Sequence, residues 1–295
     1  MATVTAIHFT DPGCPWAYSA RPAHARLVWR FGEQIEWRLV MIGLAERAED
    51  YERRGYRPER HAIGWRVFEE RFGMPFAFPV KARVAGTAPA CRAIVAAREQ
   101  DPALAEAAFR ALQTMQFTSA RLLDEEDDLR AALARVPGLD ADAIVGRIHD
   151  PDVVAAYEAD RALARSAEGS PTHAQGRFAT TDGPVRYTAP SVIFEHAGGG
   201  RIEVGGFQPF EAYDTALANL DSSLERRPPP TDAAEALTAF PHGLTTAEVA
   251  AVLRPSDLVD ADRTAAAGQL AALAGEGRVS CEHFGSDAVW RLSHS

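Results

Sequence analysis

The chain has 295 residues, of which 46% are hydrophobic and 24% charged, a composition typical of a folded globular protein with one or two domains. Its net charge of −10 at pH 7 argues against polyanionic partners such as nucleic acids. No apolar run approaches the ~20 residues that a membrane helix needs. The first residues also lack the basic and apolar regions of a signal peptide. We therefore expect a cytoplasmic protein without a membrane anchor.

The first 44 residues predict a strand, a helix and a second strand. Residues 4–9 (VTAIHF) have the apolar and β-branched character of a buried strand. The helix is expected to begin at Pro15, which is tolerated in a first helical turn, and to run to Gly32. Residues 35–44 (IEWRLVMIGL) predict the second strand. Because a helix connects them, the two strands should be parallel.

A helical insertion is expected from about residue 51 to 165. Four of its segments place apolar residues at helical spacing: 88–100, 102–117, 125–136 and 151–167. A polar, glycine-rich loop over 168–185 follows it. Residues 187–206 then predict two strands joined by a glycine-rich turn, and residues 207–224 a closing helix. The first domain is therefore predicted to span residues 1–224.

The segment 225–231 is the clearest linker, because three consecutive prolines cannot continue a helix. Beyond it, residues 232–295 predict three helices and two β-segments, which suggests a small winged-helix-like domain. From Thr231 onward there are four Arg and no Lys against nine Asp and Glu, a net charge of −5. Since phosphate contacts dominate DNA affinity, we favour docking to a protein partner or homodimerisation over nucleic-acid binding.

The stretch FTDPGCPWAYSA (residues 9–20) carries the strongest chemical signal. It places Cys14 where a strand turns into a helix, and the unpaired N–H groups of a helix N-terminus lower the pKa of a thiol. The sequence thus predicts an exposed and activated thiolate. The alternative is that Cys14 is a small buried residue in a convenient turn. Ala17 stands where a second thiol would resolve a mixed disulfide, which argues against dithiol oxidation of proteins.

The motif DPGCPWAYSA resembles the active-site stretch of DsbA-like thioredoxin-fold proteins. Its second half resembles the branch with 2-hydroxychromene-2-carboxylate isomerases and kappa-class glutathione transferases. The helical insertion, TAPSVIF (residues 188–194) and VGGFQPFEAYDTAL (residues 204–217) occur in the order expected for this family. The resemblance covers roughly residues 1–224 and implies an α/β thioredoxin-like fold. It also implies a cis peptide bond between Ala189 and Pro190, opposite the reactive residue.

The candidate site consists of Cys14 as nucleophile and Pro15, Trp16, Tyr18, Ala189 and Pro190 as substrate-binding residues. Trp16 would wall an apolar site, and Tyr18 would donate a hydrogen bond to a thiolate or carbonyl; packing against the sheet is the alternative for both. A cis Pro190 would let the Ala189 backbone pair with a substrate. Cys91 is either a remote resolving thiol or, more commonly for such a helix, a core residue. Cys281 is expected to be inert.

Three hypotheses for function follow. The first is a thiol-dependent oxidoreductase that performs monothiol exchange through Cys14. The second is an isomerase or glutathione-transferase-like enzyme for an aromatic or polyketide-like molecule, and the third is a non-catalytic thioredoxin-like adaptor. No tightly bound cofactor is expected, although the first two hypotheses call for a low-molecular-weight thiol of the glutathione or mycothiol type. No pair of His residues has metal-ligand spacing, so no metal site is predicted.

Overall fold

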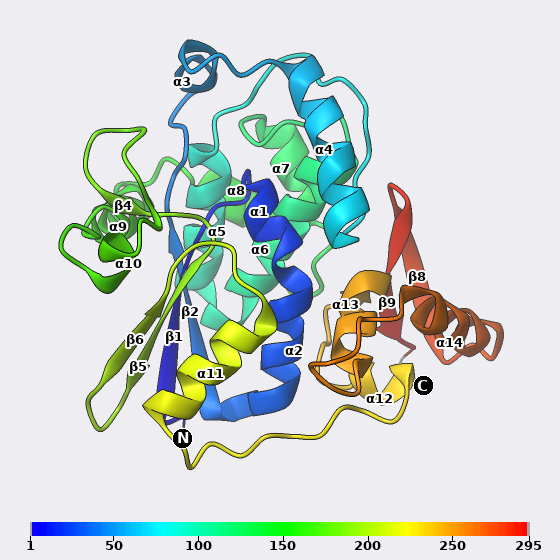
Figure 1. Cartoon of the computed structure of the whole chain (residues 1–295). Helices are drawn as coiled ribbons and strands as arrows, with labels where there is room; N and C mark the ends of the chain where they lie inside the picture. Colours follow the sequence, from blue (N-terminus) through cyan, green and yellow to red (C-terminus); the bar gives the residue numbers. More distant parts are fainter. Residues whose placement is uncertain (1, 294–295) are drawn as a thin grey trace.

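A four-stranded sheet forms the centre of the first part of the chain (Figure 1). The computed structural model describes residues 2–293. Its central strands are β1 (Val4–Thr10), β2 (Ile35–Met41), β5 (Ser191–His196) and β6 (Arg201–Val204). They follow the order β2-β1-β5-β6, with β1 parallel to β2 and antiparallel to β5, and β5 antiparallel to β6. The predicted strands and the parallel first pair are confirmed.

The single helix predicted between β1 and β2 is in fact two helices. Helix α1 (Pro15–Ser19) ends at Ala20, where α2 (Arg21–Phe31) begins, and a short 3-10 turn η1 (Gly32–Gln34) leads into β2. Pro22 explains the break, because its ring nitrogen cannot donate the hydrogen bond that would continue one helix into the other. As a result Cys14 precedes a helix of only five residues.

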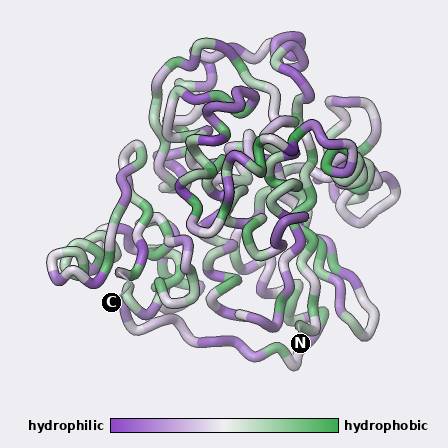
Figure 2. Tube along the Cα trace, turned by 180° about the vertical axis from the view of Figure 1, so that it is seen from behind, coloured by the Kyte–Doolittle hydropathy of each residue, from purple (hydrophilic) through white to green (hydrophobic). Residues whose placement is uncertain are grey.

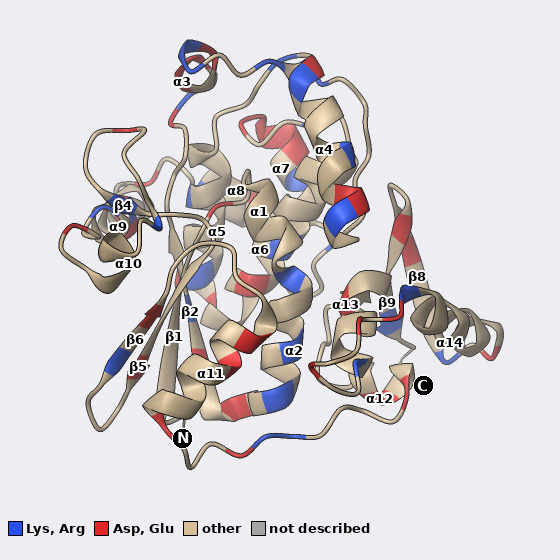
Figure 3. Ribbon diagram, in the orientation of Figure 1, with Lys and Arg blue, Asp and Glu red and all other residues tan. Residues whose placement is uncertain are grey.

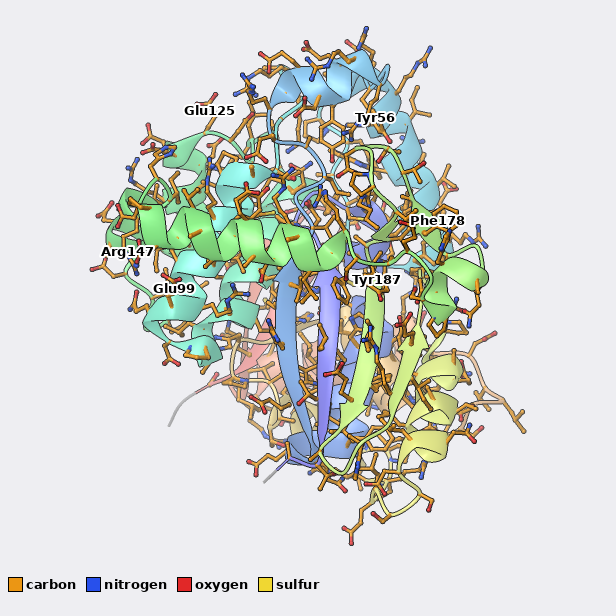
Figure 4. All side chains as sticks on the ribbon, turned by 90° about the vertical axis from the view of Figure 1, so that its left-hand side faces the viewer. Tyr56, Glu99, Glu125, Arg147, Phe178 and Tyr187 are labelled. Carbon is orange, nitrogen blue, oxygen red and sulfur yellow. The ribbon has the colours of Figure 1, made fainter. Side chains whose placement is uncertain are left out.

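Helices cover both faces of the sheet. Helix α2 and the closing helix α11 (Phe210–Leu220) pack on one face, where Leu27, Phe194 and Tyr213 belong to one buried cluster (Figure 1). Helix α9 (Pro151–Ala164) packs against β2 and crosses the strands in the side view of Figure 4. The hydropathy trace shows hydrophobic segments in the strands, and largely hydrophilic outer loops (Figure 2). The predicted α/β thioredoxin-like class is therefore confirmed.

The helical insertion contains more helices than the sequence predicted. The four expected segments form α5 (Ala88–Gln100), α6 (Pro102–Thr118), α7 (Glu126–Leu133) and α9. The structure adds α3 (Ala48–Arg53), α4 (Pro58–Phe72) and α8 (Ala141–Gly146). Helix α4 contacts α1 and rises beyond it in Figure 1. The predicted loop 168–185 includes α10 (Pro171–Ala174) and β3 (Phe178–Ala179), which pairs with β4 (Arg186–Tyr187).

The C-terminal part forms its own small group of helices and strands. These are α12 (Ala233–Leu237), β7 (Leu244–Thr245), α13 (Thr246–Leu253), α14 (Arg263–Gly275), β8 (Val279–Phe284) and β9 (Asp287–Leu292). The strands form an antiparallel sheet of order β7-β9-β8. Leu237, Val249 and Leu270 belong to a buried cluster that also includes Ala25 and Trp29 of α2. This arrangement is consistent with an additional winged-helix-like domain. The boundaries at 224 and 232 stay a prediction, and residues 225–231 contain no helix or strand.

A buried ion cluster joins the C-terminal helices to the first part of the chain. The carboxylate of Glu248 on α13 accepts hydrogen bonds from Arg21 of α2 at 3.1 Å and from Arg110 of α6 at 2.8 and 3.0 Å. Charged bands on α2 lie toward α13 in Figure 3. Although burial alone would raise the pKa of Glu248, Arg110 and Arg21 together lower it to about 2. Glu248 is thus a fully buried carboxylate held ionised between the two parts. Within residues 2–293, no helix is both long and apolar enough to cross a membrane.

Candidate active site around Cys14

A buried aspartate shapes the turn that carries Cys14. Asp11 accepts hydrogen bonds from the backbone N–H groups of Gly13 and Leu44, each at 2.8 Å, and from the Thr87 hydroxyl at 3.0 Å. The Cys14 backbone N–H in turn donates to the Asp11 carbonyl at 3.1 Å. These bonds connect the end of β1 to the segment after β2 and to the start of α5. The turn is therefore fixed from three sides before α1 begins.

Cys14 is a buried thiol and not the exposed thiolate that the sequence predicted. The residue is only 6% exposed, and its Sγ donates a hydrogen bond to the Ala189 carbonyl oxygen at 3.2 Å. Burial raises the pKa of Cys14 to about 12, outweighing the backbone N–H groups of Ala17 and Trp16, which lower it. The prediction failed because desolvation penalises a thiolate more than the N-terminus of a five-residue helix stabilises it.

The structure brings Cys14 and Ala189 together at one end of the neighbouring strands β1 and β5. The Ala189–Pro190 peptide bond is cis, as the resemblance implies. Because the Ala189 carbonyl faces the sulfur, its oxygen is engaged by Cys14 instead of being free to pair with a substrate. Pro190 is buried directly before β5. The predicted backbone pairing of Ala189 with a substrate therefore stays a prediction that requires the thiol to release this carbonyl.

A cavity of about 390 Å³ opens beside Cys14. Pro15 and Trp16 line it from α1, and residues of α3, α4 and the segment before α5 form its other walls. Trp16 packs edge-on against Phe68 of α4, with ring centroids 4.8 Å apart, and is itself 42% exposed. Trp16 thus lies in the cavity wall, and its role in substrate binding stays a prediction. The volume falls in the range of small-molecule sites.

Tyr18 does not belong to this cavity, which corrects its predicted place in the site. Its ring is fully buried and stacks on Phe117, with centroids 4.8 Å apart. Its hydroxyl donates a hydrogen bond to the Pro75 carbonyl at 2.9 Å. Tyr18 belongs to a buried cluster with Phe76 and Phe117 of the insertion. It packs α1 against the insertion and does not line the cavity.

The cavity wall is strongly cationic, which the sequence analysis missed. None of its lining residues is Asp or Glu. Five of them have basic side chains: Arg54, Arg60, Lys81, Arg83 and Arg186. Arg83 pairs with Asp124 at 2.8 Å, and Arg186 pairs with Asp182 at 3.0 Å. The other three have no carboxylate within 4.0 Å among residues 2–293. The cavity therefore carries an excess of positive charge.

Lys81 is the only lysine of the chain, and it lies in this cavity. It is almost completely buried and donates a hydrogen bond to the Gln116 side-chain oxygen at 2.9 Å and another to the Arg121 carbonyl. Burial lowers the pKa of its amine to about 7. The sequence analysis did not single out Lys81, although one lysine in an arginine-rich chain was a signal that could have directed attention to it.

Aromatic side chains form the apolar part of the cavity. Tyr51 and Tyr56 come from α3 and the connection after it, and Trp65 comes from α4. Tyr56, labelled in Figure 4, lies on that connection beyond the end of the sheet. The run from Tyr51 to Phe72 is rich in arginine and aromatic residues, which was the available signal for this wall. The cavity can therefore receive a molecule that combines negative charge with an apolar portion.

The other two cysteines lie outside this cavity. Cys91 is completely buried on α5 and its Sγ lies 3.6 Å from a carboxylate oxygen of Asp11, so it is a core residue of the turn. Cys281 is exposed on β8, and all three cysteines are free. Burial also raises the pKa of the Cys91 thiol. Within residues 2–293, no group of three or more His, Cys, Asp or Glu side chains could hold a metal ion.

Comparisons with known proteins agree with this architecture. Over 251 residues, the chain is 27% identical to the ClpXP adapter protein SpxH of Shouchella clausii, covering 83% of this chain and 76% of that protein. The cytosolic disulfide reductase DsbM of Pseudomonas aeruginosa superposes with a TM-score of 0.51 at 19% identity, over 74% of this chain and all of that one. A "probable DsbA oxidoreductase" of Streptomyces coelicolor gives a TM-score of 0.51 at 20% identity, over 77% and 93%.

The family assignment rests on the part of the chain that contains the site. A model of the DSBA-like thioredoxin domain matches residues 5–179, which include the Cys14 turn and the helical insertion. The likeness to the two solved structures shows the same fold. The chain therefore belongs to the DsbA-like thioredoxin domain family.

Proposed function

We propose that this protein is a thiol-dependent oxidoreductase that exchanges disulfides with a small anionic thiol, using Cys14 as its only reacting sulfur. The observation that carries the proposal is the cavity beside Cys14, which is lined by five basic side chains and by no Asp or Glu. An open groove for a protein substrate would not need such a concentration of charge. A thiol of the glutathione type has two carboxylates, whereas mycothiol has none, so the charge favours the glutathione type.

The exchange would proceed in two steps that need no second cysteine. Deprotonated Cys14 attacks one sulfur of a small disulfide RSSR; a Cys14–SR bond forms, the S–S bond breaks, and RS⁻ leaves with the proton that Cys14 gave up. The thiolate of a second small thiol R′SH then attacks the R sulfur, forming RSSR′ and releasing the Cys14 sulfur, which takes back a proton. Ala17 cannot perform this resolving step, and Cys91 is fully buried.

The cations would act on both the substrate and the nucleophile. Arg54 and Arg60 are available to bind carboxylates because no carboxylate among residues 2–293 pairs with them. Burial lowers the pKa of Lys81 to about 7, and a carboxylate bound beside it would favour its protonated form. Arg186 lowers the pKa of Cys14, although burial outweighs this effect. A fold relative, DsbM, was solved with GSH, which makes glutathione the natural probe.

The test is to incubate the protein with oxidised glutathione and to identify modified cysteines by peptide mass spectrometry. We expect one glutathionyl group on Cys14, absent in Cys14→Ser and retained in Cys281→Ser. Lys81→Met should form the adduct at least tenfold more slowly, since one of the cations that bind the carboxylates is lost. Absence of a Cys14 adduct between pH 7 and 9, with modification only of Cys281, would rule out the proposal.

Two alternatives have observations of their own. The aromatic side chains of the cavity favour the isomerase or transferase hypothesis for an aromatic substrate. That hypothesis predicts turnover that survives in Cys14→Ser. The 27% identity to an adapter protein favours the adaptor hypothesis, which predicts partner binding without any reaction at Cys14. The protein partner or second copy would then use the C-terminal helices and strands.

A further inference from the structure

A second cavity lies between the helical insertion and the C-terminal helices and strands, away from Cys14. Its volume is about 540 Å³, larger than the cavity beside Cys14. The insertion contributes residues of α6, α7 and the loop between them. The C-terminal part contributes the segment before β7 and residues of β8, β9 and their turn. Any molecule bound there would contact both parts of the chain.

The charges around this cavity do not balance. Five arginines line it. Among residues 2–293, only three carboxylates lie within 4.0 Å of these arginines: Glu248, Asp128 and Glu282. Arg21 and Arg110 share Glu248, which lies fully buried behind them. Arg135 and Arg291 share Glu282, and Arg121 pairs with Asp128 at 3.0 Å. Glu106 of α6 also acts electrostatically on Arg110 and Arg21, so five arginines face four carboxylates. An excess of one positive charge therefore remains at this cavity, in a chain whose net charge is −10.

Glu282 is the only acidic residue that lines the cavity. It comes from β8, accepts from Arg291 at 3.3 Å through one carboxylate oxygen, and contacts Arg135 of the insertion through the other. Both arginines present planar forks that suit oxyanions. Glu282 thus places one carboxylate, with a single negative charge, between two guanidinium groups. A ligand with more negative charge and more oxygen atoms would suit the same position.

His242 adds an unsatisfied polar atom to the same wall. Its Nδ1 is buried and has no hydrogen-bond partner in the part of the chain that the structure describes, residues 2–293. Its backbone carbonyl accepts from Arg291 at 3.2 Å, and the next carbonyl, of Gly243, accepts from Arg110 at 3.1 Å. Burial, together with Arg110 and Arg291, lowers the pKa of His242, so its imidazole is neutral at pH 7. A neutral imidazole carries one N–H that can donate to an anion.

We propose that this cavity binds a small phosphate-type polyanion and that the bound anion joins the insertion to the C-terminal part. A polyanion suits a wall with an excess of positive charge, and Arg121 and Arg135 would bind it from one side and Arg291 and His242 from the other. This site is separate from Cys14 and does not depend on the function proposed above. Because both parts contribute ligands, binding would stabilise the packing between them.

The test uses the full-length chain and pyrophosphate, with binding measured by isothermal titration calorimetry at constant ionic strength. Arg291→Gln should weaken binding at least tenfold. Glu282→Gln should strengthen it severalfold, because it removes the competing carboxylate. Arg147→Gln, an exposed arginine paired with Glu99 and Asp152, is the matched control and should bind like the unmodified chain.

Two further variants separate this site from the cationic cavity beside Cys14. Lys81→Met and Cys14→Ser should leave pyrophosphate affinity unchanged if the interface cavity is the site. If Lys81→Met abolishes binding while Arg291→Gln does not, the anion belongs to the Cys14 cavity and the proposal fails. It also fails if Glu282→Gln binds no more tightly than the unmodified chain, or if no saturable binding is found.

Discussion

At the scale of single residues, Cys14 is a thiol whose surroundings stabilise its protonated form. Its S–H donates to the Ala189 carbonyl, and deprotonation would place a thiolate against the lone pairs of that oxygen. The nearby Asp11 carboxylate adds to the raised pKa, after the larger effect of burial. The chemistry proposed for this sulfur therefore requires the thiol to turn away from Ala189 or a cationic group to approach it. A substrate that displaces water without bringing a cation would leave the thiol protonated.

The pH dependence of Cys14 alkylation tests this protonation state. Because burial raises its pKa to about 12, the thiolate fraction should rise about tenfold for each unit of pH from 7 to 10 without reaching a plateau. We expect the second-order rate of iodoacetamide modification at Cys14 to follow that slope, measured by peptide mass spectrometry. The exposed Cys281 in the same samples serves as the internal comparison. A plateau in the Cys14 rate below pH 8 would contradict a protonated resting state.

At the scale of helices and strands, the sequence predicted those elements whose pattern is local. Strands β1 and β5 are rich in apolar and β-branched residues, and α5 and α6 have wide apolar faces, so their local pattern was sufficient. Helix α4 was missed because charged residues interrupt its apolar pattern, and Trp65 is its only buried residue. The break at Pro22 was missed because apolar spacing continued through it. The charge of the cavity could not be predicted, since its cations come from four separate segments that only the fold brings together.

The His8–His24 pair between β1 and α2 makes an element-scale prediction for stability. The rings pack edge to face with centroids 4.7 Å apart, and both Nε2 atoms are buried without a partner. Burial lowers the pKa of His24 to about 4. The pKa of His8 is lowered mainly by burial and, to a smaller extent, by the charge of His24. The unfolded chain therefore binds more protons than the folded one below the ordinary value of 6.5. The stability from neutral histidines is complete above pH 6.5 and is lost as the pH falls toward 4.

Urea unfolding across pH 7 to 4 checks this expectation. The free energy of unfolding should decrease through that interval, and His24→Gln should flatten the decrease because glutamine does not titrate. His149→Gln removes an exposed histidine and should leave the slope unchanged. An unaltered slope in His24→Gln would show that these rings do not control acid stability.

At the scale of the whole molecule, Glu248 connects the C-terminal part to the family domain. It caps its own helix through Thr245 and also accepts from arginines on α2 and α6, so one carboxylate fixes three helices. The family model ends at residue 179, so Glu248 lies outside the matched region, whereas Arg21 and Arg110 lie inside it. The sequence analysis identified the C-terminal part as a separate unit from its proline-rich linker. It could not foresee the junction, because Glu248 is far in sequence from both arginines.

Replacing Glu248 should loosen the C-terminal part without unfolding the central sheet. Glu248→Gln leaves Arg21 and Arg110 buried without a counter-charge, a change that typically costs about 3–5 kcal/mol. Hydrogen–deuterium exchange measured by mass spectrometry should therefore accelerate in peptides of α13 and β9 while β1 and β5 keep their protection. The exposed Glu276→Gln, which removes a surface pair with Arg278, is the control and should have no such effect.

Since the pKa of Glu248 is about 2, the same acceleration should occur in the unmodified chain only when the pH falls well below 4.5. That window lies below the one set by the histidines, so acid should first weaken the sheet–helix packing and only then the junction. Equal exchange in all peptides of Glu248→Gln would instead mean that the chain unfolds as a single cooperative unit.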